Sequence, residues 1–311
     1  MCIVSNDPVV RSAREGGRGL SSWTFFLASA LRERPGRIAW DEFGQRSGLS
    51  KSKLAAIRDV VEGLGRWELW STTAWYDIRQ RYRRSVLGPF WLTLSMGVLV
   101  GTMGILYAHL FGQSVADYVP YLALGLIAWT FIATFITEGS NVFITYSGLI
   151  SQAKAPLSTH VFRVVWRNLI IFAHNIWIYV AVAIIFGIWP GATGLLVIPG
   201  LVLVSLNGVW AGLLLGMLCV RFRDIPQIIA NVVQLLFFLT PILWKADQLT
   251  DGRAFIEANP FYHFVSLIRE PLLGVAPSLQ SWLIVLAITA LGCILAGAAF
   301  VRFRGRIAYW I

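Results

Sequence analysis

Charged residues are scarce in this chain of 311 residues. They make up 14% of it, against about 25% in soluble domains, while hydrophobic residues make up 57%. This composition excludes an ordinary soluble domain and indicates an integral membrane protein. The three cysteines, Cys2, Cys219 and Cys293, are too few and too scattered for a disulfide framework.

Nucleotide-binding and metal-binding motifs are also missing from the sequence. It contains no Gly-x-x-x-x-Gly-Lys-Ser/Thr loop and no glycine-rich fingerprint after a plausible strand. The chain therefore cannot bind and hydrolyse ATP by that route. Its four histidines have no metal-ligand spacing with one another or with cysteine. We expect no metal, no cofactor and no catalytic residue in this chain.

Six apolar runs are long enough to cross a bilayer, which takes about 20 consecutive apolar residues. None of them contains Lys, Arg, Asp or Glu. The runs cover residues 90–111, 119–137, 169–188, 195–220, 228–243 and 282–301. The predicted fold class is an all-α integral membrane protein, with six transmembrane helices in one domain of residues 89–311.

The positive charges orient these spans, because cytoplasmic segments carry the excess of Lys and Arg. All but three of the 26 Lys and Arg residues fall on one side of the membrane. The three exceptions are Lys245, Arg253 and Arg269. Both termini are therefore predicted to be cytoplasmic, in a multi-pass protein of the cytoplasmic (inner) membrane. The net charge of +10 follows from this asymmetry and from attraction to membrane lipids, so no nucleic-acid partner is expected.

The chain before the first span divides into two parts. Residues 1–60 are rich in Arg, Gly and Ser and are predicted to form a basic, poorly ordered cytoplasmic extension. Residues 61–88 are predicted to form an amphipathic helix that lies along the membrane surface. Its apolar face carries Leu64, Trp67, Trp75, Ile78 and Tyr82. Proline disfavours helix in the residue before it, so Gly88-Pro89 ends this helix and starts the first span.

Two connections between spans carry distinctive residues. The loop 138–168 contains Leu149 to Leu157, with apolar, basic and helix-breaking residues, and is a candidate contact surface for a cytosolic partner. Between spans five and six, residues 255–275 are mostly apolar but too short to cross the membrane twice. Asn259-Pro260, Pro271 and Gly274 interrupt them, which predicts two re-entrant half-helices, either buried in protein or lining a water-filled pathway.

The charged segment 221–226 between spans four and five has two interpretations. Arg221 and Arg223 can neutralise the end of one helix, while Asp224 caps the next and Pro226 occupies its first turn. Alternatively, the segment is a cytoplasmic elbow on which a soluble partner pushes. The aromatic residues at the span ends also have two interpretations. They either form membrane belts and core, or they offer ring faces to sugars. Those in question are Phe90, Trp91, Phe237 and Phe238.

Together, these motifs resemble the permease subunit of type 2 ABC exporters, in the branch that exports lipid-linked polysaccharides such as O-antigen, capsule or teichoic acid. The resemblance covers about residues 64–311. It rests on the order and spacing of several short motifs around six spans. These are Asp77 to Trp91, Arg221 to Asp224, Thr240 to Trp244, Asn259-Pro260, Arg269 with Leu273-Gly274, and Gly305 to Ile311.

The resemblance implies a homodimer whose two permeases form a channel, with two copies of a separate ATPase that holds ATP and Mg²⁺. It implies no enzyme activity in this chain and a lipid-linked glycan as cargo. The ATPase would act on Trp75, Asp77, Arg81, Tyr82, Arg83, Lys154 and Pro156. Arg221, Arg223 and Asp224 would form a gate or hinge, and Phe90, Trp91, Phe237 and Phe238 would line the channel. The re-entrant exit region would contain Pro260, Arg269, Glu270 and Gly274.

Two alternative functions remain open at this stage. The same fold could export a lipooligosaccharide or a small amphipathic compound. A different class is a membrane enzyme that acts on polyprenyl-linked sugars, which needs positioned carboxylates or a metal at the membrane surface. The cytoplasmic acids Glu138 and Asp224 stand alone in their segments, which disfavours the enzyme.

Overall fold

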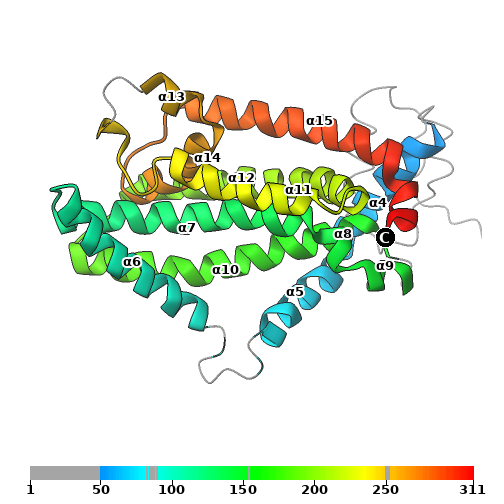
Figure 1. Ribbon diagram of the computed structural model, residues 1–311, viewed down its shortest axis with the longest axis horizontal. Helices are drawn as coiled ribbons and strands as arrows, with labels where there is room; N and C mark the ends of the chain where they lie inside the picture. Colours follow the sequence, from blue (N-terminus) through cyan, green and yellow to red (C-terminus); the bar gives the residue numbers. More distant parts are fainter. Residues whose placement is uncertain (1–49, 82, 84–87, 89, 153–154, 249–252) are drawn as a thin grey trace, which may run out of the picture.

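The structure is a computed structural model, and it describes residues 50–81, 83, 88, 90–152, 155–248 and 253–311. Within these ranges every regular element is a helix, and the long helices run along one axis of an elongated bundle (Figure 1). The elements are α4 (Lys51–Gly65), α5 (Trp67–Arg81), α6 (Phe90–Leu110), α7 (Val115–Ser140), α8 (Val142–Thr145), α9 (Ser147–Gln152), α10 (Leu157–Phe186), η1 (Gly191–Leu196), α11 (Val197–Arg221), α12 (Ile225–Leu239), η2 (Ala246–Gln248), α13 (Arg253–Ala258), α14 (Pro260–Leu272) and α15 (Leu279–Trp310).

Five of these helices are long and apolar enough to cross a membrane: α6, α7, α10, the continuous η1–α11 segment and α15. They coincide with five of the six predicted spans. The predicted fifth span corresponds to α12, which has only 15 residues. A helix of that length is about 22 Å long, which is shorter than a hydrocarbon core of about 30 Å.

The end of α12 shows why the fifth run does not form a long helix. The apolar run continues to residue 243, but the helix stops at Leu239 and Thr240 adopts extended angles of φ −93° and ψ 136°. The residue before a proline is pushed out of the helical region, and Pro241 follows Thr240. Hydropathy alone cannot detect this break, because proline and the residues after it remain apolar.

The central helix is α7, which packs against α6, α10, α11, α12 and α14. Its contact with α11 depends on small residues, as is common between helices in membranes. A Cβ atom built on Gly139 would lie 3.0 Å from the Cα atom of Gly212 on α11. A side chain on Gly139 would therefore force the two helix backbones apart, whereas one on Gly212 would meet Val161 Cγ1 of α10 at 2.9 Å.

The N-terminal part of the structure differs in detail from the predicted surface helix. The helix breaks at Arg66, so α4 and α5 are separate, and residues 51–60 of the predicted extension lie in α4. The prediction of one continuous apolar face from Leu64 onward is therefore wrong. On α5 the buried residues are Ala74 and Ile78, which face α10, whereas Trp67 is 60% exposed. Residues 1–49 lie outside the described part of the chain.

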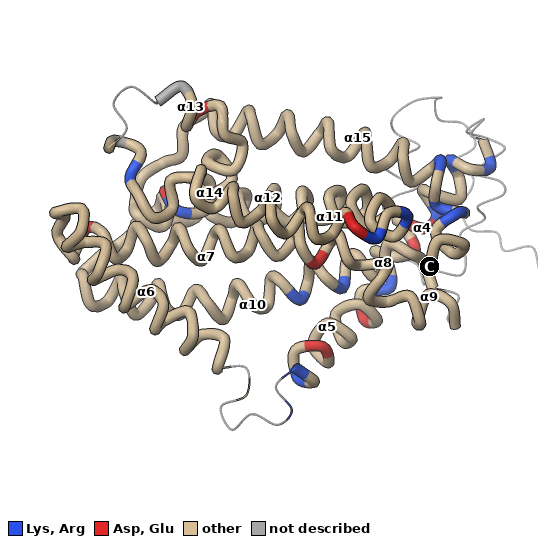
Figure 2. Tube along the Cα trace, viewed as in Figure 1, with Lys and Arg blue, Asp and Glu red and all other residues tan. Residues whose placement is uncertain are grey.

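The two ends of the bundle differ in charge. Lys and Arg concentrate at the end that carries α4, α5 and the C-terminal part of α15, whereas few mark the end with α13 and α14 (Figure 2). This distribution agrees with the asymmetry used to orient the spans. The two short helices α13 and α14 flank Asn259, where the sequence predicted two half-helices, and α14 packs among α7, α11 and α15.

Candidate functional site

A cluster of charged side chains joins α5 to α7 and α10 at the charge-rich end of the bundle. We call it the inner charge cluster, and it consists of Asp77, Glu138, Tyr146, Arg163 and Arg167. Asp77 accepts hydrogen bonds from Arg163 Nε at 2.8 Å and Arg163 Nη2 at 2.5 Å. It also accepts one from Arg167 Nη1 at 3.1 Å. Asp77 thereby fixes α5 to two successive turns of α10.

The other members of the cluster extend it to α7 and to the segment after α8. Arg167 Nη2 donates to Glu138 Oε2 at 2.7 Å, which ties α10 to the end of α7. The Tyr146 hydroxyl donates to Asp77 at 3.0 Å and accepts from Arg167 at 3.0 Å. The Arg163 guanidinium lies 4.4 Å from the centre of the Tyr146 ring, within cation–π range. Four separate segments therefore meet at one group of side chains.

The charges in this cluster balance and stabilise one another. Burial alone would raise the pKa of Asp77, but the hydrogen bond and charge of Arg163, with the charge of Arg167, outweigh it and lower that pKa below its usual value. Burial is the main cause of the raised pKa of the Tyr146 hydroxyl, which stays a donor. A cavity of about 260 Å³ lies beside the cluster, lined partly by Arg81, Glu138 and Arg167.

The predicted coupling residues occupy different positions in the structure. Asp77 is central to the cluster, and Arg81 lies at its edge with Nη2 at 3.6 Å from Glu138. Trp75 and Arg83 are exposed, whereas Pro156 is buried immediately before α10. Tyr82 and Lys154 lie outside the described residues.

Sequence reasoning missed Arg163, Arg167 and Tyr146, and it treated Glu138 as an acid that stands alone in its segment. The reason is that residues 157–168, predicted as part of a loop, belong to the long helix α10. Two arginines four residues apart on a helix occupy one face. This spacing indicates a shared site for Arg163 and Arg167, but it can be used only if the helix is known to start at Leu157.

The segment 221–224 contacts the end of α15. Arg223 Nη2 donates to the carbonyl oxygens of Trp310 at 3.4 Å and Ile311 at 3.3 Å. The Arg221 guanidinium lies 5.8 Å from the Trp310 ring. The predicted capping by Asp224 is wrong, because its side chain makes no cap hydrogen bond and its backbone is helical. Pro226 does occupy the first turn of α12, as predicted.

A second cluster lies at the opposite end of the bundle. We call it the outer polar cluster, and it consists of Tyr121, Thr240, Pro241, Asn259 and Arg269. Arg269 is 4% exposed, donates to the Pro241 carbonyl at 2.8 Å and lies 4.1 Å from the Tyr121 ring centre. The Tyr121 hydroxyl donates to the same carbonyl at 2.9 Å. The break after α12 is therefore held by both α7 and α14.

Asn259 adds a second connection within the outer polar cluster. Its amide nitrogen donates to Thr240 Oγ1 at 3.0 Å, and its amide oxygen accepts from the Phe261 backbone N–H at 3.0 Å. The motifs around residues 240, 259 and 269, which are distant in sequence, thus form one unit. Pro260 opens α14, Glu270 lies in its last turns, and Gly274 follows it with a positive φ of 83° that favours glycine.

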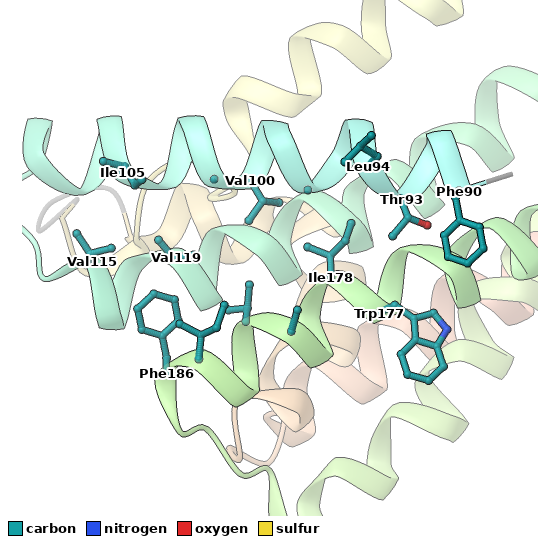
Figure 3. Close-up of a pocket in the computed structure, with 15 residues that line it drawn as sticks. Phe90, Thr93, Leu94, Val100, Ile105, Val115, Val119, Trp177, Ile178 and Phe186 are labelled. Carbon is teal, nitrogen blue, oxygen red and sulfur yellow. The ribbon is translucent and has the colours of Figure 1, made fainter. Parts of the chain in front are cut away.

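The candidate channel aromatics divide between two places. Phe90 lines an apolar cavity of about 700 Å³ between α6, α7 and α10, with Trp177 and Phe186 also on its wall (Figure 3). Trp91 is 51% exposed on α6. On α12, Phe237 packs against Trp129 of α7, whereas Phe238 is 59% exposed. The structure of one copy does not bring the two pairs together.

The comparisons with a family model and with curated proteins agree on one protein family. The family model described as ABC-2 type transporter matches residues 68–273, a range that contains both clusters. The chain is 25% identical over 215 residues to the O-antigen export system permease protein RfbA of Myxococcus xanthus, covering 64% of this chain and 82% of that protein. Two Klebsiella pneumoniae proteins of the same name are each 22% identical, over 196 and 199 residues, covering 62% of this chain and 76% of theirs.

Proposed function

The chain belongs to the ABC-2 type transporter family, and from this premise we propose that it is the channel-forming permease of an ATP-driven exporter. Its cargo is a lipid-linked polysaccharide of the O-antigen type, carried across the cytoplasmic membrane. The observation that carries the proposal is the similarity to O-antigen export permeases of two organisms. The chain acts as a transporter subunit and not as an enzyme.

The energy source must come from another subunit, because the sequence has no phosphate-binding loop. Two copies of this chain and two copies of a separate ATPase would form the working unit, with ATP and Mg²⁺ held by the ATPase. The ATPase would act on the charge-rich end of the bundle, where α5 and the start of α10 lie. A push on α5 reaches α10 and α7 directly, because Asp77 and Arg167 join the three helices.

The glycan path lies between two copies in this proposal. The exposed apolar residues of α6 and α12 support it, since a single copy leaves them without a protein partner on one face. On α12 these are Ile228, Val232, Leu235, Phe238 and Leu239. The aromatic rings of Trp91 and Phe238 offer flat apolar faces on which sugar rings stack.

The test is the ATPase activity of this chain in lipid nanodiscs, with and without the separate ATPase subunit that the proposal requires. Purified lipid-linked glycan is added to each sample. We expect hydrolysis only in the complex, and a further increase when glycan is present. A complex that responds to small amphipathic compounds and not to glycan would contradict the proposed cargo. Failure to form any complex would contradict the permease role itself.

A further inference from the structure

We propose that Asp59 of α4 is a positioning residue, which sets the cytoplasmic start of α10 and couples its movement to α15. Asp59 lies outside the segment that matches the family model, which starts at residue 68. The positional part of this inference stands on the structure alone. Its consequence for transport rests on the proposed function.

The Asp59 carboxylate caps α10 from another helix. Oδ2 accepts from the Leu157 backbone N–H at 3.1 Å, and Oδ1 accepts from the Ser158 backbone N–H at 3.0 Å. The first N–H groups of a helix have no partner within it, and a side chain at the N-cap position usually supplies one. Pro156 occupies that position in α10 and makes no side-chain cap. Asp59, whose side chain is 0% exposed, takes over this role.

Two further contacts join α4 to the same place. Arg304 of α15 donates from Nε to Asp59 Oδ2 at 2.7 Å, so one carboxylate binds two helices. The Ser158 hydroxyl donates to the Asp59 backbone carbonyl at 2.8 Å. Close approach depends on Gly63, where an added Cβ atom would lie 2.1 Å from Ser158 Oγ. The fit of α4 against α10 therefore leaves no room for a methyl group.

This arrangement has a mechanical consequence. Pro156 is a predicted ATPase-coupling residue, and it is followed at once by the two residues that Asp59 holds. A displacement of Pro156 must then move α4 and Arg304 together with α10. Beyond Arg304, the C-terminal end of α15 is also bound by Arg223, which lies in the segment between α11 and α12. Asp59 thus connects the start of α10 to the predicted elbow through α15.

The first test uses Asp59→Asn, which keeps the size of the side chain but removes its charge and one acceptor. The control is Glu62→Gln, on the same helix, where the partner lost among the described residues is the exposed Arg58. Spin labels are placed at the exposed positions Lys53→Cys on α4 and Ser151→Cys on α9, with the native cysteines replaced by alanine. We expect the distance distribution to broaden at least twofold in Asp59→Asn and to remain unchanged in Glu62→Gln. Equal distributions in both variants would overturn the positional role.

A second pair of variants tests the position of α4 without changing the Asp59 carboxylate. Gly63→Ala should displace α4 and broaden the same distribution, because its methyl group collides with Ser158 Oγ. Adding Ser158→Ala removes that oxygen and leaves the new Cβ atom 3.2 Å from the Thr159 nitrogen and 3.3 Å from the Ser158 Cβ atom. It also removes the hydrogen bond to the Asp59 carbonyl, so the double variant should give a distribution narrower than that of Gly63→Ala alone. A double variant as broad as Gly63→Ala would contradict this account of the contact.

Coupling is measured as the ATP hydrolysed per glycan exported by the reconstituted complex. We expect this ratio to rise about tenfold in Asp59→Asn, as loss of a charge-assisted contact implies, with hydrolysis itself unchanged. A broadened distance distribution with an unchanged ratio would overturn the coupling role and leave a stabilising cap. If wild-type protein exports no glycan, the proposed function fails, and the distance measurements still decide the positional role.

Discussion

Replacing Asp77 by Asn should release α5 from the bundle. The only buried residues on α5 are Ala74 and Ile78 among those described, and full burial of one such aliphatic side chain stabilises by about 1.5–3 kcal/mol. The inner charge cluster adds three hydrogen bonds from arginine to Asp77. A hydrogen bond to a charged group contributes about 1.5–3 kcal/mol, so the ionic contacts are at least as large as the apolar ones.

We estimate that Asp77→Asn lowers the free energy of opening α5 by about 2–3 kcal/mol. The loss is limited because the amide keeps one acceptor oxygen and water replaces part of the lost arginine hydrogen bonds. This corresponds to a rise of about 30- to 150-fold in the opening equilibrium of α5. Backbone hydrogen exchange of residues 67–81 in nanodiscs measures this equilibrium directly. Faster exchange should be confined to α5 and the first turns of α10.

The matched control is Glu68→Gln, which removes the same charge from an exposed position of the same helix. It should change exchange by less than about twofold, as expected for a surface charge. Equal effects of the two variants would refute the importance of the cluster. A double-mutant cycle with Arg163→Gln then measures the pair itself, and strict additivity would show that the two residues do not interact.

Three further outcomes are expected from the same structure. The lowered pKa of Asp77 means that its ionised form stabilises the α5 contact at every pH above the unfolded value of about 3.9, and that this contribution is lost only as pH falls through the lower folded pKa. The protection factors of α5, which correct for the base-catalysed intrinsic exchange rate, should therefore be the same at pH 5 and pH 8. Arg269→Ala should lower the free energy of unfolding by about 2–4 kcal/mol, because it removes a buried hydrogen bond and a cation–π contact. Lys245→Ala, whose ammonium lies farther from the same Tyr121 ring at 5.7 Å, should cost less, and an equal shift would contradict the role of Arg269. Gly212→Ala should destabilise by about 1–3 kcal/mol, because its Cβ atom would lie 2.9 Å from Val161 Cγ1. Gly297→Ala, inside α15, meets nothing within 4 Å and should stabilise by up to about 1 kcal/mol in the same unfolding assay.

Hydropathy was sufficient to locate the long helices but not their ends. The start of α10 lies 12 residues before the predicted span at residue 169, because its first turns are polar and project beyond the apolar stretch. The end of α12 lies before residue 243 because Pro241 changes the backbone without changing hydropathy. Both errors have the same cause, since apolar runs report the membrane environment and hydrogen bonding decides where a helix begins and ends.

Contacts between distant segments explain most of what the sequence could not predict at the site. Asp77, Asn259 and Arg269 were selected from their motifs, but nothing in the motifs identifies Arg163 or Pro241 as their partners. Such pairing depends on the packing of α5 on α10 and of α14 on α7, with Asn259 against the end of α12. Asp59 belongs to none of the sequence motifs. Only its burial and its distance to the first N–H groups of α10 reveal a role.

The two clusters are connected by one helix. Glu138 of the inner charge cluster and Tyr121 of the outer polar cluster both belong to α7, whose rise of about 1.5 Å per residue places them about 25 Å apart. Between them, α7 is the most buried of the long helices and carries no charge. Close packing of Gly139 on Gly212 leaves it little freedom to bend near its inner end. If the proposed ATPase displaces α5 and α10 at Glu138, we expect the displacement to reach Tyr121 along α7, and from there the Pro241 carbonyl that α14 also holds.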